Sequence, residues 1–201
     1  MSTDSIPRKQ APSLQGKIKW RRFALILTPT VIIMAALVGL TANGAIAASM
    51  SVSGQEFLVT AKQLNGTGFD QFGGQVTAPS GTKPVVVSAI HSATLAGLCQ
   101  QVTIGGVTLT LRAGGGGTPV SASNLIVDAS SQSGSEAVFH NITIGQDSGS
   151  LSEDPGASGP AGGFGQEADS VTINNLVQHT WLTTAGTFTL PNLTMGFGGS
   201  C

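Results

Sequence analysis

The chain has 201 residues, of which 40% are apolar, only 9% are charged and 28 are glycine. This length fits one ordinary domain with an appendage, and the high hydrophobicity with low charge excludes a disordered chain. Six of the nine basic residues precede residue 23, whereas three basic and nine acidic residues follow residue 48, which gives residues 49–201 a net charge of −6. A domain with so few cations cannot neutralise phosphates, which excludes nucleic acid as a partner.

The first 48 residues predict an export signal. Residues 1–22 form a polar and basic tail, and residues 23–48 contain an uncharged apolar run that ends in small residues. These are the parts of a secretory signal peptide, so we predict cleavage after Ala47 or Ala48. The alternative is a retained transmembrane helix, because about 20 apolar residues span a bilayer. In both cases residues 49–201 are expected to be an exported domain, extracellular or on the cell surface.

The exported part contains the only two cysteines, Cys99 and Cys201. An oxidising compartment allows such a pair to form a disulfide, and two free thiols are the alternative. Neither cysteine has the spacing of a metal or redox motif, so the sequence predicts no cofactor.

The exported part is predicted to be all-β. From residue 51 onward, short segments rich in Val, Ile and Thr are separated by Gly, Pro, Asn and Ser, a pattern typical of strands and turns. No stretch keeps a helical period over three turns. Residues 85–109 and 171–195 match each other without a gap, which indicates a repeated β unit.

Four asparagines, each followed by an aliphatic residue, recur at regular spacing. Asn124, Asn141, Asn175 and Asn192 are separated by 17, 34 and 17 residues. Asparagine tolerates the left-handed backbone conformation of tight corners. A corner followed by an inward aliphatic residue would recur once per turn of a coil, so the spacing favours a β-solenoid or β-prism-like stack of short strands. The alternative is a β-sandwich, in which the spacing is coincidence.

Residues 145–170 form a long loop that holds five acidic residues. Calcium takes oxygen ligands from flexible loops, so we consider a calcium site with Asp147, Glu153 and Asp154 as candidate ligands. The acids lack the regular spacing of known calcium loops, and the alternative is a solvated loop.

The hypothesis that the protein is a hydrolase depends on its three histidines, His91, His140 and His179. The Gly-x-Ser-x-Gly motif that exposes a serine nucleophile is absent, and each histidine lies within or beside a β segment, where a structural role is expected. Outside the acidic loop, Asp128 with Glu136 is the carboxylate pair available for glycoside hydrolysis, and nothing marks it as buried. The sequence therefore predicts no catalytic residue.

Several segments together resemble a known family. They include WRRFA before the apolar run, LNGTGFDQFG, NITIGQD, PGASGPAGGFGQEADSVTINNL and TTAGTFTLPNLTM near a C-terminal cysteine. The chain resembles a family of uncharacterised secreted actinobacterial proteins, a domain of unknown function that often carries the label "cholesterol esterase". The resemblance implies export in a Gram-positive host and supplies no catalytic residues. Members are often encoded near a small multi-pass membrane protein, which implies an envelope partner.

These observations lead to three hypotheses for function. The first is a non-enzymatic cell-envelope protein that binds a surface, a lipid or a membrane-protein partner, and the second is the secreted lipid-ester hydrolase of the family label. The third is a structural subunit that self-associates through exposed strand edges. Trp181 and Phe188 are expected in the core, with lipid or partner contact as the alternative.

Overall fold

The computed structural model describes residues 53–154 and 156–201, and over these residues the protein is all-β. The tail of residues 1–22, the apolar segment of residues 23–48 and the cleavage residues Ala47 and Ala48 lie outside the described residues. In the part of the chain that is described, no helix has the length and hydropathy needed to cross a membrane. A 3-10 turn, η1 (Ser148–Ser150), accompanies the strands, which are β1 (Phe57–Ala78), β2 (Gly81–Ala96), β3 (Leu98–Ile104), β4 (Val107–Ala113), β5 (Val120–Ser133), β6 (Glu136–His140), β7 (Thr143–Asp147), β8 (Phe164–Thr184), β9 (Thr187–Thr189) and β10 (Thr194–Phe197).

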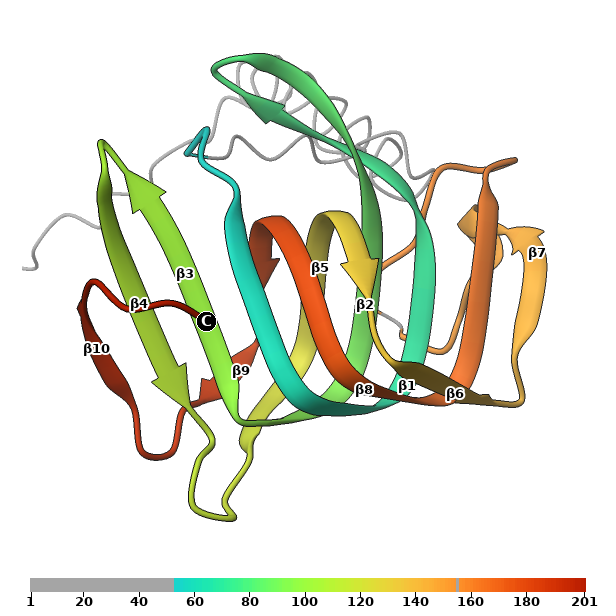
Figure 1. Cartoon of the computed structure of the whole chain (residues 1–201). Helices are drawn as coiled ribbons and strands as arrows, with labels where there is room; N and C mark the ends of the chain where they lie inside the picture. Colours follow the sequence, from blue (N-terminus) through green and yellow to red (C-terminus); the bar gives the residue numbers. More distant parts are fainter. Residues whose placement is uncertain (1–52, 155) are drawn as a thin grey trace, which may run out of the picture. The chain divides into compact units, whose positions relative to one another are not determined.

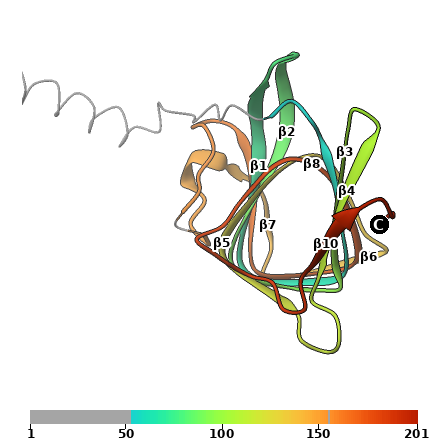
Figure 2. The same cartoon turned by 90° about the vertical axis from the view of Figure 1, so that its left-hand side faces the viewer.

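The strands belong to four long runs of chain that lie side by side (Figure 1). The first run is β1, the second is β2 and β3, the third is β4 to β7, and the fourth is β8 to β10. Each run pairs antiparallel with the next, through β1 with β2, β2 with β5 and β5 with β8. In addition β8 pairs with β1, from Phe57↔Thr180 to Phe72↔Gly165. The four runs therefore close into a cylinder. Figure 2 looks down the axis of this cylinder, so the strands appear as a ring.

The all-β prediction is confirmed, but the structure does not show the solenoid or prism-like stack of short strands. The described strands form one ten-stranded antiparallel sheet, which also differs from the alternative, a two-sheet sandwich. The reason is that β1 and β8 contain 22 and 21 residues, so several glycines expected to end short strands lie inside long ones. A Cβ atom at Gly66, for example, would lie 2.6 Å from Cγ2 of Ile90, so glycine serves close packing there.

The four regularly spaced asparagines are corners of these long runs. Asn124, Asn141, Asn175 and Asn192 have φ angles of 46°, 53°, 49° and 53°, and within the described residues every other positive φ belongs to glycine. Asn124 lies at a gap in the β2–β5 ladder and Asn175 at a gap in the β1–β8 ladder. The aliphatic residue that follows is buried after Asn124 and Asn175 but exposed after Asn141 and Asn192. The predicted left-handed conformation is thus present at all four asparagines, and the predicted inward aliphatic at two, although Asn124 and Asn175 lie within β5 and β8 and not between short strands.

Replacing Asn124 tests the corner directly. We expect Asn124→Ala to lower the free energy of unfolding by about 1 to 2 kcal/mol, because a Cβ-bearing residue without a local polar side chain is strained at positive φ. Asn124→Gly is the matched control and stays near the wild type, since glycine adopts this conformation without strain. Urea denaturation measures both, and equal stability of the two variants would contradict the assignment.

The interior of the cylinder is filled mainly by aliphatic side chains from all four runs. The larger buried cluster includes Leu64 and Phe69 from β1, Leu95 from β2, Leu125 from β5 and Leu176 from β8. Because these side chains come from runs that are distant in sequence, the core depends on closure of the sheet. A smaller cluster, in which Val76, Ala78 and Val85 pack against Trp181 and Leu182, fixes the end of the β1–β2 hairpin.

Candidate docking surface

Three strands form a flap at one end of the sheet, and we call β3, β4 and β10 the flap (Figures 1 and 2). β3 pairs with β4 from Leu98↔Ala113 to Ile104↔Val107, and β4 pairs with β10. Among the described strands, β10 pairs with β4 alone, so its second edge carries free backbone N–H and C=O groups.

One face of the flap is almost entirely apolar. Paired residues of antiparallel strands point to the same side of the sheet, and Leu109 pairs with both Val102 and Phe197. Residues two positions away share that side. The face is made of Val102, Ile104, Val107, Leu109, Leu111, Met195 and Phe197, with Gln100 as its polar member. Phe197 is 81% exposed, and Ile104 and Met195 are each 60% exposed.

The apolar face continues into the first strand and the core. β1 pairs with β3 through Leu58↔Gln101 and Val59↔Gln100, and the same register places Phe57 opposite Val102. Val59 is buried in the core cluster, and Phe57 packs against that cluster. The core of the cylinder therefore opens toward this end as a band of hydrophobic side chains that ends at the exposed ring of Phe197.

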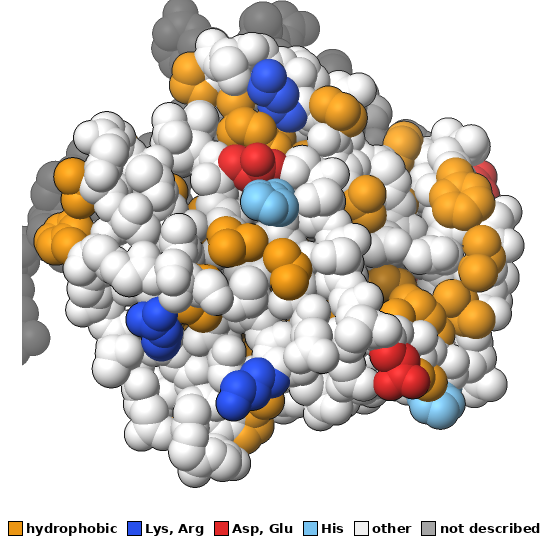
Figure 3. Space-filling model, viewed as in Figure 1, with side chains coloured by type: hydrophobic (Ala, Val, Ile, Leu, Met, Phe, Trp, Pro, Cys, Tyr) orange, Lys and Arg blue, Asp and Glu red, His pale blue; other side chains and the backbone are white. Residues whose placement is uncertain are grey.

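The opposite face of the flap is polar and holds the C-terminal tail. Arg112 Nη2 donates to the Ser200 carbonyl at 2.7 Å, and the backbone N–H of Cys201 donates to Gln101 Oε1 at 2.8 Å. The sulfur atoms of Cys99 and Cys201 lie 2.03 Å apart, so the predicted disulfide is present. In Figure 3 the surface over the flap that faces the viewer is mostly white and shows few hydrophobic side chains. The two faces thus differ sharply in polarity.

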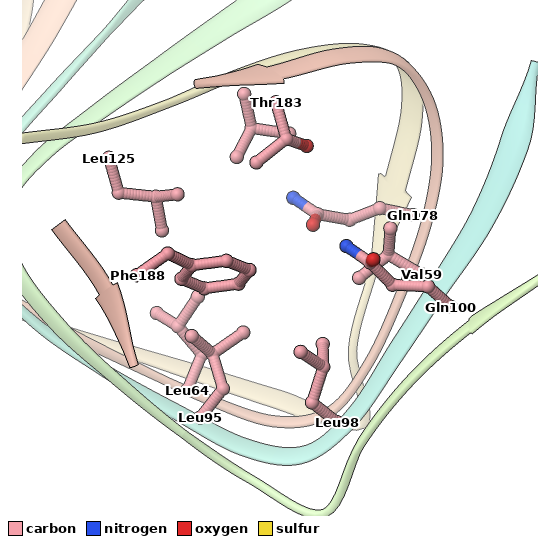
Figure 4. Close-up of a pocket in the computed structure, with 10 residues that line it drawn as sticks. Val59, Leu64, Leu95, Leu98, Gln100, Leu125, Gln178, Thr183 and Phe188 are labelled. Carbon is pink, nitrogen blue, oxygen red and sulfur yellow. The ribbon is translucent and has the colours of Figure 1, made fainter. Parts of the chain in front are cut away.

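The interior of the cylinder is too small to be a lipid pocket. It contains a cavity of about 20 Å³, lined by aliphatic side chains, Phe188 and the polar side chains of Gln100, Gln178 and Thr183 (Figure 4). A water molecule needs roughly 10 to 15 Å³ of such space, whereas ligand pockets have about 300 to 1,000 Å³. This cavity therefore has room for one water and is too small for a lipid.

The predicted loop of residues 145–170 is shorter in the structure, because β7 ends at Asp147 and β8 begins at Phe164. The remaining loop packs against β1 and β8 and lies over buried carboxylates. Asp70 and Asp154 are 0% and 1% exposed, and the backbone N–H of Asp154 donates to Asp70 Oδ2 at 2.8 Å. Glu167 lies directly opposite Asp70 in the β1–β8 ladder. Burial raises the pKa of the Asp70 carboxyl from 3.8 to about 6, against the lowering effect of the Asp154 N–H, and the nearby charges of Glu167 and Asp154 add to the rise.

A family model matches residues 53–201 of the chain, and its description is "Family of unknown function (DUF6230)". The chain belongs to the DUF6230 family. No curated protein and no solved structure matches the chain. The DUF6230 match covers all the described residues and confirms the expected domain of unknown function, but its description contains no esterase activity, so the label "cholesterol esterase" is not confirmed.

The structure does not bring the candidate histidines of a hydrolase into hydrogen-bond contact with a serine nucleophile. His91, His140 and His179 are exposed on β2, β6 and β8. Between a serine side chain and a histidine, we find in the described part of the chain one hydrogen bond, in which the Ser130 hydroxyl donates to the backbone carbonyl of His179 at 3.4 Å. This contact leaves the imidazole unused and gives no nucleophile–base pair.

The carboxylate candidates are also separated. Asp128 is half-buried, with a pKa raised by burial, and it pairs with Leu182 of β8. Glu136 is exposed and pairs with Asn174 of β8, and its carboxylate accepts a hydrogen bond from the Asn174 side chain at 2.8 Å. The two residues therefore sit at different levels of the sheet, eight positions apart in sequence.

The three calcium candidates have different surroundings. Asp147 Oδ1 accepts from the backbone N–H groups of Gly149 and Gly162, both at 2.8 Å, and so stabilises the loop. Asp154 is buried, and Glu153 is half-buried. Within residues 53–154 and 156–201, no three or more His, Cys, Asp or Glu side chains are grouped closely enough to hold a metal ion. These three residues therefore do not form a ready-made calcium site.

Sequence reasoning missed the apolar face of the flap, although a signal was present. Around Gly105 and Gly106, apolar residues alternate with threonine on both sides, which is the pattern of a hairpin with one apolar face. It also missed Asp70, because nothing in the sequence marks that carboxylate as buried. Trp181 and Phe188 pack against the core clusters, as expected.

Proposed function

We propose that the protein is an exported, non-enzymatic protein of the cell envelope that rests on a lipid surface through the apolar face of the flap. The observation that carries this proposal is the hydrophobic band that runs from the half-buried Phe57, beside the core, to the exposed Phe197. Large exposed apolar patches on a folded domain mark interaction sites, because their burial is favourable by about 25 cal/mol per Å².

The short segment between the apolar residues 23–48 and β1 supports a lipid surface as the partner. Residues 23–48 carry no charge, and eight residues separate Ala48 from Phe57. Eight extended residues span at most roughly 30 Å. If residues 23–48 are retained as a transmembrane helix, which is the alternative to cleavage, this tether keeps Phe57 within roughly 30 Å of the bilayer.

The charges of the flap also support a lipid surface. β3, β4 and β10 contain no acidic residue, and Arg112 is their one charged side chain, although residues 49–201 are acidic as a whole. A strongly acidic face would be repelled by anionic lipid headgroups, and the flap avoids that repulsion.

Photocrosslinking tests the proposal with the full chain in vesicles of phosphatidylcholine and phosphatidylglycerol that contain a photoactivatable phospholipid. We expect crosslinks on β10 and on the β3–β4 hairpin, identified by mass spectrometry of the digested protein. Replacing Met195 and Phe197 together with serine is expected to reduce these crosslinks by about tenfold or more, because each apolar side chain contributes roughly 1.5 kcal/mol or more on burial.

Phe164→Ser is the matched control, because Phe164 is 66% exposed but lies at the start of β8, outside the flap. It is expected to leave the flap crosslinks unchanged. Crosslinks confined to residues 1–52, or equal effects of the flap and control substitutions, would refute the lipid proposal.

The unpaired edge of β10 favours a second candidate function, self-association into a structural layer. Two such edges can pair antiparallel, which would join two flaps. Size-exclusion chromatography with light scattering distinguishes self-association from lipid binding alone. Edge pairing gives a dimer, and the substitution Met195→Pro is expected to disrupt it. A monomer at all concentrations would exclude it.

A further inference from the structure

A second concave site lies away from the flap, beside the base of the β1–β2 hairpin. It is a groove of about 440 Å³, lined mainly by Gln71, Phe72, Gly73, Val86, Phe164 and Gln166. This volume lies within the range of about 300 to 1,000 Å³ that small-ligand sites occupy. We infer that this groove binds a neutral carbohydrate.

The lining of the groove excludes a charged ligand and limits apolar ones. No charged side chain lines it, and its two polar side chains are the amides of Gln71 and Gln166 on neighbouring strands. An acyl chain in the groove would cover these amides without giving them hydrogen-bond partners, which is unfavourable. A sugar ring suits the lining better, because it presents a C–H face to an aromatic ring and hydroxyl groups to amides.

Hydrogen bonds hold the two amides in place. Gln166 Nε2 donates to Gln71 Oε1 at 2.6 Å, and Gln71 Nε2 donates to Ser88 Oγ at 2.8 Å. The hydrogen-bond network continues toward the interior of the cylinder. There Gln132 Oε1 accepts a hydrogen bond from Gln178 Nε2 at 3.0 Å and lies 3.5 Å from Ser88 Oγ. The two outer bonds leave the Gln166 carbonyl oxygen and one N–H of each amide for a ligand. Such a connected network orients polar groups before a ligand arrives.

The strand pairing argues against an extended peptide as the ligand. A peptide that binds by adding a strand needs a free sheet edge. At the groove β1 has partners on both sides, since Gln71 pairs with Ser88 of β2 and with Gln166 of β8. The exposed ring of Phe164 and the apolar side chain of Val86 instead provide surfaces on which a ring can stack.

Gly73 allows the groove to be filled without disturbing the fold. A Cβ atom there would meet no atom within 4 Å, and Gly73 is not among the glycines with positive φ. Valine also suits a strand position. We therefore expect Gly73→Val to fold as the wild type does while blocking the groove.

The test is calorimetric titration of the full chain in phosphatidylcholine nanodiscs with neutral hexasaccharides of glucose, mannose or galactose. We expect at least one to bind, and we expect both Gly73→Val and Gln166→Ala to weaken it by about tenfold or more. Gly115→Val is the matched control, because Gly115 also has open space at Cβ and no positive φ, and it does not line the groove.

Three outcomes would overturn the inference: no hexasaccharide binds, Gly73→Val binds as tightly as Gly115→Val, or the groove takes a fatty acid or an uncharged peptide instead. The outcome is independent of the lipid proposal, because Phe164→Ser is expected to weaken sugar binding and to spare the flap crosslinks. The Met195 and Phe197 substitutions are expected to do the reverse.

Discussion

Replacing both Cys99 and Cys201 with serine is expected to lower the free energy of unfolding by about 4 to 5 kcal/mol. The disulfide joins residues 102 positions apart, and a crosslink over such a long loop removes much conformational entropy from the unfolded chain. The loss equals a large part of the stability of an ordinary domain. Urea denaturation of the oxidised wild type and the double variant, at the same pH, measures it.

The control for this experiment separates the disulfide from the other contacts of the C-terminal tail. Arg112→Ala removes the hydrogen bond to the Ser200 carbonyl but keeps the disulfide, and an exposed bond of this kind contributes only about 1 kcal/mol. If the double cysteine variant loses no more stability than Arg112→Ala, the disulfide does not stabilise the fold. Hydrogen exchange in β10 is expected to rise more in the cysteine variant than in the control.

The stability of the protein is expected to fall as the pH rises from about 4 to 6. The folded Asp70 carboxyl has a pKa of about 6 and the unfolded one 3.8, so over this window the folded state holds a proton that the unfolded state has released. Each pKa unit corresponds to about 1.4 kcal/mol, which gives a loss of roughly 2 to 3 kcal/mol that is complete near pH 7. Urea denaturation at intervals between pH 4 and pH 7 measures the slope.

Asp70→Asn isolates the contribution of this carboxyl. Asparagine keeps an oxygen that accepts the Asp154 N–H but carries no charge, so we expect most of the fall between pH 4 and 6 to disappear. A smaller fall remains from Asp128, whose pKa is also raised by burial, and stability at pH 7 is expected to equal or exceed that of the wild type. Glu136→Gln, at an exposed acid on β6, is the matched control and is expected to keep the wild-type slope. An unchanged slope in Asp70→Asn would show that other groups cause it.

Local features of the fold were predictable from the sequence because they depend on a few adjacent residues. The left-handed corners follow from the short polar side chain of asparagine, which tolerates a positive φ angle. The disulfide was predicted from the presence of only two cysteines, both in the part of the chain that we expect to be exported. Neither inference needs knowledge of which strands pair.

Closure of the sheet and both candidate sites were not predictable, because they depend on pairing between distant residues. The apolar band requires β1, β3, β4 and β10 to lie in that order, and the groove requires Gln71 beside Gln166. The strand lengths were also predicted too short, because glycines that usually mark turns lie inside β1, where they allow close packing. A pattern of alternating residues indicates a strand but not its partner.

The pairing of the first run with the last has a consequence for biogenesis. Phe57 meets Thr180 across 123 positions of sequence, so the contact order of the fold is high and the ring cannot shut until almost the whole polypeptide has emerged. Up to that moment the amino-terminal strand keeps a bare edge that is prone to aggregation. This late completion would fit the export that we propose, in which the chain crosses a translocation channel unfolded and folds on the far side.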